Sequence, residues 1–158
     1  MHVFEHSPET RSLFLYFFGE LIGPEFDDAI LEAARALPLR HLKAVVTVVA
    51  DLRDITAADL THTDGGRVFW FESQLRQTLQ MTHTDFESFM LGLKIARLIH
   101  QQSSASATFR KRLKLTNAPA IVDREQVFTS VQAVAEAVGQ DAAYIDDRLR
   151  HLAHKARL

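Results

Sequence analysis

The chain contains no cysteine among its 158 residues. Thiol catalysis, disulfides, iron–sulfur clusters and thiolate zinc sites are therefore excluded. A chain without cysteine is also typical of a reducing compartment, so we expect a cytoplasmic location.

An excess of charge of one sign is absent as well. The chain has 18 Lys and Arg residues against 20 Asp and Glu residues, for a formal net charge of -2. This balance gives no global attraction to nucleic acid or to an anionic membrane. No apolar run approaches the roughly 20 residues that span a bilayer. The first ten residues show no basic region followed by an apolar run, as a signal peptide would. We expect neither a nucleic-acid partner nor membrane insertion.

The familiar catalytic motifs are missing too. The chain has no Gly-x-Ser-x-Gly elbow, no Gly-x-Gly-x-x-Gly turn, no phosphate loop ending in Gly-Lys-Ser/Thr and no His-Glu-x-x-His. These motifs serve acyl transfer, dinucleotide binding, phosphate binding and zinc hydrolysis. We therefore expect no catalytic residue, no metal and no cofactor, and thus a protein that is not an enzyme.

What the chain does contain is an alternation of strand and helix patterns. The length and the apolar fraction of 47% suit one soluble domain with a real core. Strands are expected at residues 2–6, 12–22, 43–52, 76–83 and 118–123, and helices at 23–37, 66–75, 85–102, 129–139 and 142–155. This order predicts an α/β fold: a mixed five-stranded sheet, with an N-terminal hairpin followed by parallel βα units, covered by helices. Residues 1–140 form the domain, and residues 141–158 add a C-terminal helix to it.

One four-residue word, Thr-His-Thr-Asp, occurs at residues 61–64 and again at residues 82–85. The second copy predicts a helix start, because Thr84 followed by Glu87 matches the capping box. In the first copy, Thr63 or Asp64 could cap the next helix. The alternative is a metal site, which needs three or four converging ligands. Its ligands would be His62, Asp64, His83 and Asp85.

Acidic and hydroxyl side chains follow the strongest strand pattern. Asp51, Asp54 and Asp59 come at or just after its end, where open α/β sheets bind ligands. A paired-carboxylate hydrolase site is one interpretation. The other is that Asp51 caps the strand and that the remaining acids belong to a solvated loop.

Large apolar residues are concentrated around the third and fourth helix patterns. Val68 to Phe71 are four consecutive apolar residues on an expected helix, which cannot bury all of them against one sheet. In one interpretation, some of them meet a partner subunit, a groove or a small amphiphilic ligand. In the other, they serve core packing alone. The candidate residues for this apolar interface or ligand site are Phe69, Trp70, Phe86, Phe89 and Met90.

Two stretches resemble a known family. The strand "AVVTVVADLRDIT" followed by "AADLT" resembles the central strand and turn of STAS-like domains, the fold of anti-sigma-factor antagonists. Asp51 matches the end of that strand, Asp59 the acid of the turn, and Thr61 its second hydroxyl, whereas Leu60 and His62 depart from the Ser and Gly of the pattern. The stretches "FMLGLKIARLIHQ" and "VFTSVQAVAEAVG" are similar to the last two helices of uncharacterised STAS-like relatives.

The resemblance implies a non-catalytic regulatory module that binds a protein partner or a second copy of itself. Some STAS-like domains are switched by phosphorylation in that turn, which implies Thr61 as the phosphoacceptor here. A phosphate would add about two negative charges. The related CRAL-TRIO branch holds lipids, so a carrier or sensor of a small amphiphile is the alternative function, and a hydrolase is the third. The partner or switch loop would comprise Asp51, Asp54, Thr56, Asp59 and Thr61.

Overall fold

The structure is a computed structural model that describes residues 1–22, 25–59, 65–100 and 125–158. Its centre is a five-stranded sheet whose spatial order follows the chain order, β1-β2-β3-β4-β5. The strands are β1 (His2–Ser7), β2 (Ser12–Ile22), β3 (Thr47–Asp59), β4 (Lys94–Leu98) and β5 (Glu125–Phe128). β1 is antiparallel to β2, and every later pair is parallel. The mixed five-stranded α/β sheet that the sequence predicts is confirmed.

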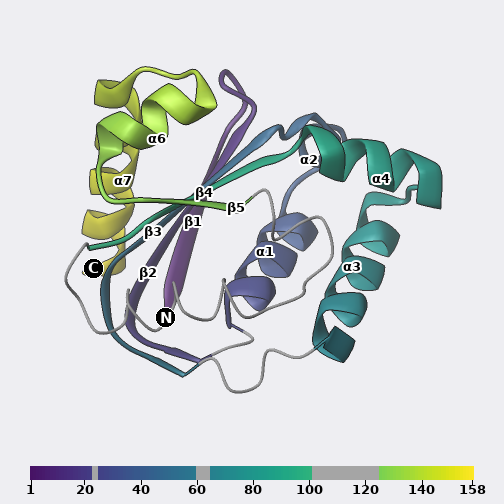
Figure 1. Ribbon diagram of the computed structural model, residues 1–158, viewed down its shortest axis with the longest axis horizontal. Coiled ribbons are helices and arrows are strands. Elements are labelled where there is room, and N and C mark those ends of the chain that lie inside the picture. Colours follow the sequence, from purple (N-terminus) through teal and green to yellow (C-terminus); the bar gives the residue numbers. More distant parts are fainter. Residues whose placement is uncertain (23–24, 60–64, 101–124) are drawn as a thin grey trace.

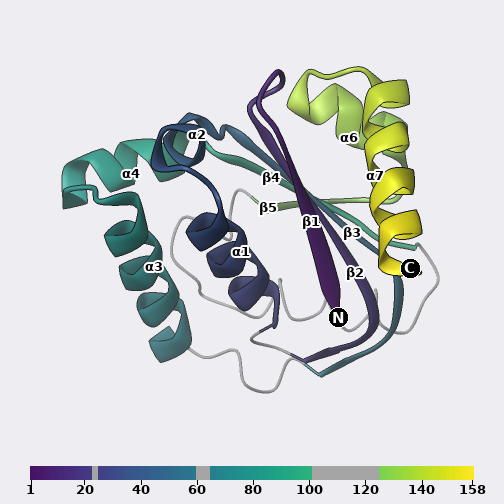
Figure 2. The ribbon, with the colours of Figure 1, turned by 180° about the vertical axis from the view of Figure 1, so that it is seen from behind.

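Helices lie on both faces of the sheet (Figure 1). One side carries α1 (Glu25–Ala36), α2 (Leu39–Ala44), α3 (Gly65–Leu79) and α4 (His83–Gly92), and the other carries α6 (Val131–Val138) and α7 (Ala142–Ala156). Figure 2 shows the same layers from behind, with β1 at the front edge of the sheet. The sequence patterns do not predict α2, a short helix that follows Pro38.

The core between the sheet and α1 is formed by side chains that alternate along the strands. Leu13, Leu15 and Phe17 of β2 point to this side and are buried. They pack against Phe26 at the start of α1, whose ring is stacked on Phe17 with the ring centroids 5.3 Å apart. The three acids in the first turn of α1 face the positive end of the helix dipole, which stabilises this helix start.

The opposite face of the sheet is covered by the two C-terminal helices. Phe14 and Tyr16 of β2 pack with Val49 of β3 and with buried residues of α6 and α7. Ile145 and Leu149 of α7 are almost fully buried in this cluster. The C-terminal helix is therefore part of the core.

A third apolar cluster attaches α3 to the outer side of α1. Leu31 and Ala34 of α1 are buried against Phe71 and Leu75 of α3, together with Phe86 of α4. Both views place α3 beyond α1, farther from the sheet (Figures 1 and 2). α1 thus packs on the sheet with one stripe and on α3 with another.

Two sequence-based assignments in the middle of the chain are wrong. Of the strand expected at residues 76–83, residues 76–79 form the last turn of α3. Gln80 follows in the left-handed region at φ 54°, and His83 already begins α4. The alternation of Thr and Gln suggested a strand, but Leu75 and Leu79 are four residues apart and are both buried in the third cluster. The burial of apolar residues at helical spacing therefore outweighed the alternating pattern in this segment.

The long helix expected at residues 85–102 is also wrong. α4 ends at Gly92, and β4 begins at Lys94. Ile95 to Ile99 are all buried, as expected for a strand covered on both faces. A run that is apolar except for Arg97 satisfies helical spacing as well, which explains the error. The strand expected at residues 118–123 lies outside the described residues, and the fifth strand begins at Glu125.

β3 is longer than the sequence pattern predicts. We expected a strand that ends at Leu52, but β3 continues to Asp59 beside β2. Tyr16 pairs with Asp51 whereas Phe18 pairs with Asp54, so β3 contains one extra residue between the two pairs. A second shift follows at Gly19. Such bulges bend a strand without ending it. The loop predicted after the end of this strand is therefore wrong for the residues up to Asp59, which belong to β3.

Candidate functional site

The bulged part of β3 holds an ion pair whose carboxylate is buried and whose guanidinium is half-buried. The Asp51 side chain lies on the α7 side of the sheet, and the residue is only 2% exposed. Arg53 donates from Nε to Oδ1 at 3.0 Å and from Nη2 to Oδ2 at 2.9 Å, and its backbone N–H also donates to Oδ1. These bonds, against the opposing effect of burial, raise the pKa of Arg53. Both oxygens of Asp51 are thus occupied by one guanidinium.

The second acid of this segment is bound by a tyrosine. Tyr16 donates its phenolic hydrogen to Oδ2 of Asp54 across the β2–β3 pair. The first bulge is the reason why this bond forms, because it brings Asp54 to the same face as Asp51. Burial, and then the bond to Asp54, raise the pKa of Tyr16 well above its ordinary value. Tyr16 therefore stays protonated and acts as a donor.

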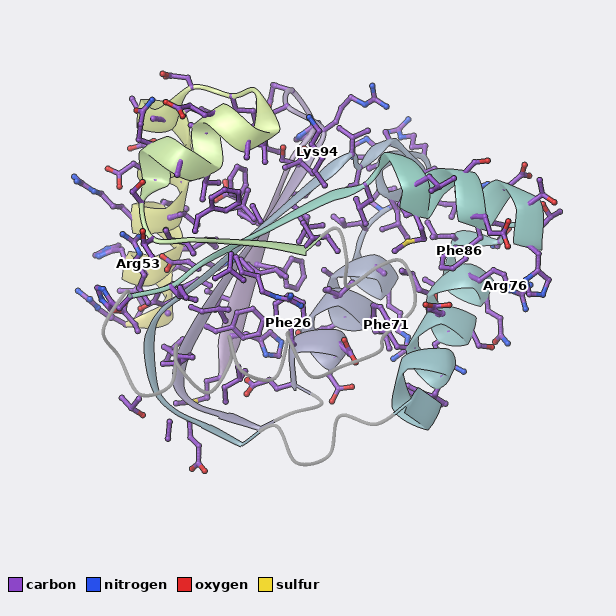
Figure 3. All side chains as sticks on the ribbon, viewed as in Figure 1. Phe26, Arg53, Phe71, Arg76, Phe86 and Lys94 are labelled. Carbon is purple, nitrogen blue, oxygen red and sulfur yellow. The ribbon has the colours of Figure 1, made fainter. Side chains whose placement is uncertain are left out.

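This arrangement bears on the predicted partner or switch loop. Asp51 and Asp54 lie on one face and are each bound by a neighbouring side chain, whereas Thr56 is exposed. Asp59 is the last residue of β3, and Thr61 lies outside the described residues. In Figure 3, Arg53 lies beside α7, on the side of the sheet opposite Phe26. The Tyr16–Asp54 bond links β2 to β3, and the Asp51–Arg53 pair lies within β3, so each carboxylate accepts from a neighbouring side chain.

The repeated Thr-His-Thr-Asp word serves the backbone in its second copy, as expected, but through a different residue. The N-cap of α4 is Thr82, whose side chain accepts from the backbone N–H of Asp85 at 3.2 Å. The expected N-cap, Thr84, is inside the helix. The error is one of register, because the cap is the first threonine of the word and not the second.

The alternative metal site cannot be assembled from the described part of the chain. There, no group of three His, Cys, Asp or Glu side chains has a geometry that could hold a metal ion. His83 and Asp85 are both exposed on α4. His62 and Asp64 lie outside the described residues, as does Thr63, the other expected cap.

An open groove runs between α1 and α3. It has a volume of about 420 Å³. α1 supplies two acidic side chains, one basic side chain and two apolar side chains, and α3 supplies the indole ring of a tryptophan. The lining residues are Asp28, Leu31, Glu32, Arg35, Ala36 and Trp70. Trp70 is 41% exposed, which is unusual for so large an apolar side chain. The groove therefore presents an apolar surface with charges along its α1 wall.

The charges of the α1 wall are ordered along the helix. Asp28 and Glu32 are one turn apart toward the N-terminal end, and Arg35 follows in the last turn. Glu32 also bonds to Nε2 of His2 on β1 at 2.7 Å. The wall is thus acidic at one end and basic at the other.

The structure divides the predicted apolar set. Trp70 lines the groove, and its neighbour Phe71 points between α3 and α1 into the third cluster (Figure 3). Phe86 is buried in the same cluster, and Phe89 and Met90 pack against it. The side chain of Phe69 is not among those that the structure describes. Within this set, the described residues place Trp70 alone on the groove.

Sequence reasoning missed Arg97. It lies on β4, faces α1 and is 5% exposed, with its guanidinium carbon 4.3 Å from the centre of the Phe26 ring. Burial lowers the pKa of Arg97 to about 9, and the nearby Asp27 opposes that shift. The side chain therefore stays charged at neutral pH. A single Arg inside the apolar run from Ile95 to Ile99 was the available signal, hidden by the helix assignment.

No protein-family model matches the chain, and no curated protein matches it. Among solved structures, the chain is similar to the anti-sigma factor antagonist SpoIIAA in its unphosphorylated form. The match has a TM-score of 0.42 and 15% sequence identity, and it covers 87% of this chain and 96% of that chain. A match at this TM-score carries no argument about fold or function.

The helices can also be compared with what a bilayer requires. In the described ranges, no helix combines the length and the apolar character needed to cross a membrane.

Proposed function

We propose that the protein is a non-catalytic regulatory module that acts by binding another protein, and that the partner places an amphipathic helix in the groove between α1 and α3. The observation that carries the proposal is the exposed Trp70 beside the charged stripe of α1. Tryptophan is among the residues most enriched at the energetic centres of protein interfaces. A groove between two helices is also a known receptor for an amphipathic helix.

The order of charges on α1 defines the chemistry of the partner. Asp28 and Glu32 favour a Lys or Arg near one end of the docked helix, and Arg35 favours an Asp or Glu about one to two turns away. An apolar side chain between them would rest on Leu31 and Trp70. Rim charges of this kind set the orientation and the rate of docking more than the affinity. Most of the binding energy is therefore assigned to Trp70.

Regulation in this proposal involves the segment that connects β3 to α3. Thr61, the phosphoacceptor that the resemblance implies, precedes Trp70 by nine positions in the sequence. A phosphate there adds about two negative charges. Because opposite charges attract, it would raise the affinity for a partner whose basic residue meets Asp28 and Glu32, provided that the charges lie within about a Debye length of each other. Thr61→Glu and Thr61→Ala, compared in the same binding assay, test this element separately.

The experiment begins with a photo-crosslinking amino acid placed at Arg35, which is exposed on the groove wall. The matched control carries it at Gln132, exposed on α6 on the other side of the sheet. A protein that crosslinks from position 35 and not from position 132 is then purified, and its affinity is measured by calorimetry.

Two truncations of exposed apolar residues decide the outcome. Trp70→Ala should weaken binding of that purified protein by about 30-fold or more, the loss typical of an interface centre. Leu91→Ala removes a side chain that is even more exposed, at 61%, on α4, and should leave the affinity unchanged. Equal affinities of the unmodified chain and Trp70→Ala would exclude the groove as the docking site.

A further inference from the structure

β1 forms an edge of the sheet, and its hydrogen bonding shows which backbone groups face outward. Phe18 donates its backbone N–H to the carbonyl of Met1 at 3.0 Å. In an antiparallel pair such bonded positions alternate, so Val3, Glu5 and Ser7 also bond to β2. The N–H and C=O groups of the intervening residues therefore point away from the sheet. These residues are His2, Phe4 and His6.

The polar side chains of β1 are turned onto its own helices and not outward from the edge. His2 contacts Glu25 at 3.2 Å and Glu32 at 2.7 Å, both on α1. On the other face, Glu5 accepts from Arg148 of α7 at 3.0 Å. Edge strands are often protected from pairing by charges, prolines or bulges. β1 contains no proline and no bulge. Its side chains His2 and Glu5 bond to α1 and α7 and do not shield the outer edge of the strand.

We propose that a second copy of this chain pairs with β1, edge to edge and antiparallel, about a two-fold axis that passes near Phe4. The outward backbone groups of three residues on each strand then bond to those of the other. Phe4 lies opposite Phe4 of the partner subunit, and His2 lies opposite His6 of the partner subunit. Aromatic pairs directly opposite one another stabilise such strand pairs. The sheet becomes continuous across the dimer.

The charge distribution on α7 makes this arrangement self-complementary. Ser7 bonds to Tyr144 and Glu5 to Arg148, so α7 runs antiparallel to β1 and its middle lies beside Phe4. Its N-cap and first half carry three acids, Arg148 near the middle pairs with Glu5 and Asp147, and the charged residues after it are all bases and histidines. The acids are Asp141, Asp146 and Asp147, and the basic and imidazole residues of the second half are Arg150, His151, His154, Lys155 and Arg157. A two-fold axis at the middle of the helix brings the acidic half of one copy beside the basic half of the other.

The other face of the sheet shows the same relationship. Glu25 and Glu32 surround His2 at one end of β1. At the other end, His6 packs against His41 of α2, with the ring centroids 5.2 Å apart. The two-fold axis places the two glutamates of one copy near the two imidazoles of the other. Unlike groups therefore meet on both faces, which is the requirement for an interface that a protein makes with itself.

The test is sedimentation velocity of the full chain from micromolar to millimolar concentration, with three variants. Phe4→Pro removes an outward N–H, a substitution that edge strands tolerate, and should abolish the dimer. Asp147→Lys places like charges at the paired α7 helices and should weaken the dimer by roughly tenfold. Glu136→Lys makes the same charge change on the exposed face of α6 and should have no effect.

Amide hydrogen exchange of the unmodified chain provides a readout that does not depend on how the variants fold. Exchange at Phe4 and His6 should slow as the protein concentration rises, while exchange at Val3 and Glu5, already bonded to β2, should not change. A chain that stays monomeric across the range, or a dimer that survives both Phe4→Pro and Asp147→Lys, would overturn the proposal. Trp70→Ala should leave the dimer intact, which separates this surface from the groove.

Discussion

Asp51 and Arg53, two residues apart on β3, form an ion pair with two parallel hydrogen bonds of 3.0 and 2.9 Å. The pair lies on the α7 side of the sheet, where the first bulge also brings Asp54. A guanidinium that occupies both oxygens of a carboxylate fixes its position as well as its charge. We therefore assign this acidic segment to holding the bulged ribbon of β2 and β3 in shape.

If the Asp51–Arg53 pair holds the bulged ribbon in shape, breaking the pair should lower the free energy of unfolding. Asp51→Asn removes the negative charge and one of the two acceptor oxygens that bind the half-buried guanidinium. We expect a loss of about 1–3 kcal/mol, below the range for fully buried pairs because Arg53 is partly exposed. Urea unfolding measures the loss. In an Arg53→Met background the same substitution should cost clearly less, and an equal cost in both backgrounds would mean that the two residues do not interact.

The assignment of the α4 N-cap can be tested with a pair of neighbouring threonines. Thr82→Ala removes the oxygen that accepts from the N–H of Asp85 and should lower the free energy of unfolding by about 1 kcal/mol. Thr84→Ala changes an exposed residue within the helix and should cost less. A larger loss for Thr84→Ala would restore the capping box that the sequence suggested.

The third apolar cluster predicts opposite behaviour for two adjacent residues of α3. Phe71 is buried against α1, so Phe71→Ala should destabilise the fold by about 3–5 kcal/mol. Trp70 is partly exposed on the groove, and Trp70→Ala should cost about 1 kcal/mol or less. Thermal and urea unfolding of the two variants make the comparison. A severe loss for Trp70→Ala would assign the indole to the core and remove it from the docking site.

Acid should weaken the contact between β1 and α2. Burial and the neighbouring His41 lower the pKa of His6, while Glu9 has the opposite effect. The unfolded chain binds a proton on His6 more readily than the folded chain, because an unperturbed histidine titrates near 6.5. Stability from this residue is therefore complete above that pH and is lost as the pH falls below it.

Urea midpoints near neutral and mildly acidic pH measure this effect. The unmodified chain should lose more stability on acidification than His6→Gln does. His83→Gln changes an exposed histidine of α4, outside the proposed dimer surface, and serves as the control. If His6→Gln is as sensitive to acid as the unmodified chain, the His6–His41 contact is not responsible.

The sequence predicts the architecture better than it predicts the course of the chain in the middle. Amphipathic patterns with clear ends, such as those of α1 and α7, are found within one or two residues of their expected positions, because burial on one face determines them. The run from Ile95 to Ile99 contains no such contrast, since it is buried on both faces. Periodicity cannot separate a helix from a strand in such a run.

The site was harder to predict than the fold, for reasons of geometry. The bulge that brings Asp54 to the Tyr16 side is a property of how β2 and β3 pair, and no local pattern in either strand encodes it. The groove depends on α3 packing against α1 and not on the sheet. The four-residue apolar run that includes Trp70 did indicate that part of this helix faces outward, and that prediction agrees with the exposure of Trp70.

The most direct test of the central claim uses the chain's single tryptophan, which lies on the groove. The protein identified by crosslinking, or a tryptophan-free version of it, is titrated into the chain while the emission wavelength and iodide quenching are recorded. Docking in the groove predicts a shift of Trp70 emission to shorter wavelength and a loss of quenching, with the same midpoint as calorimetry. Binding detected by calorimetry with unchanged emission and unchanged quenching would contradict the account.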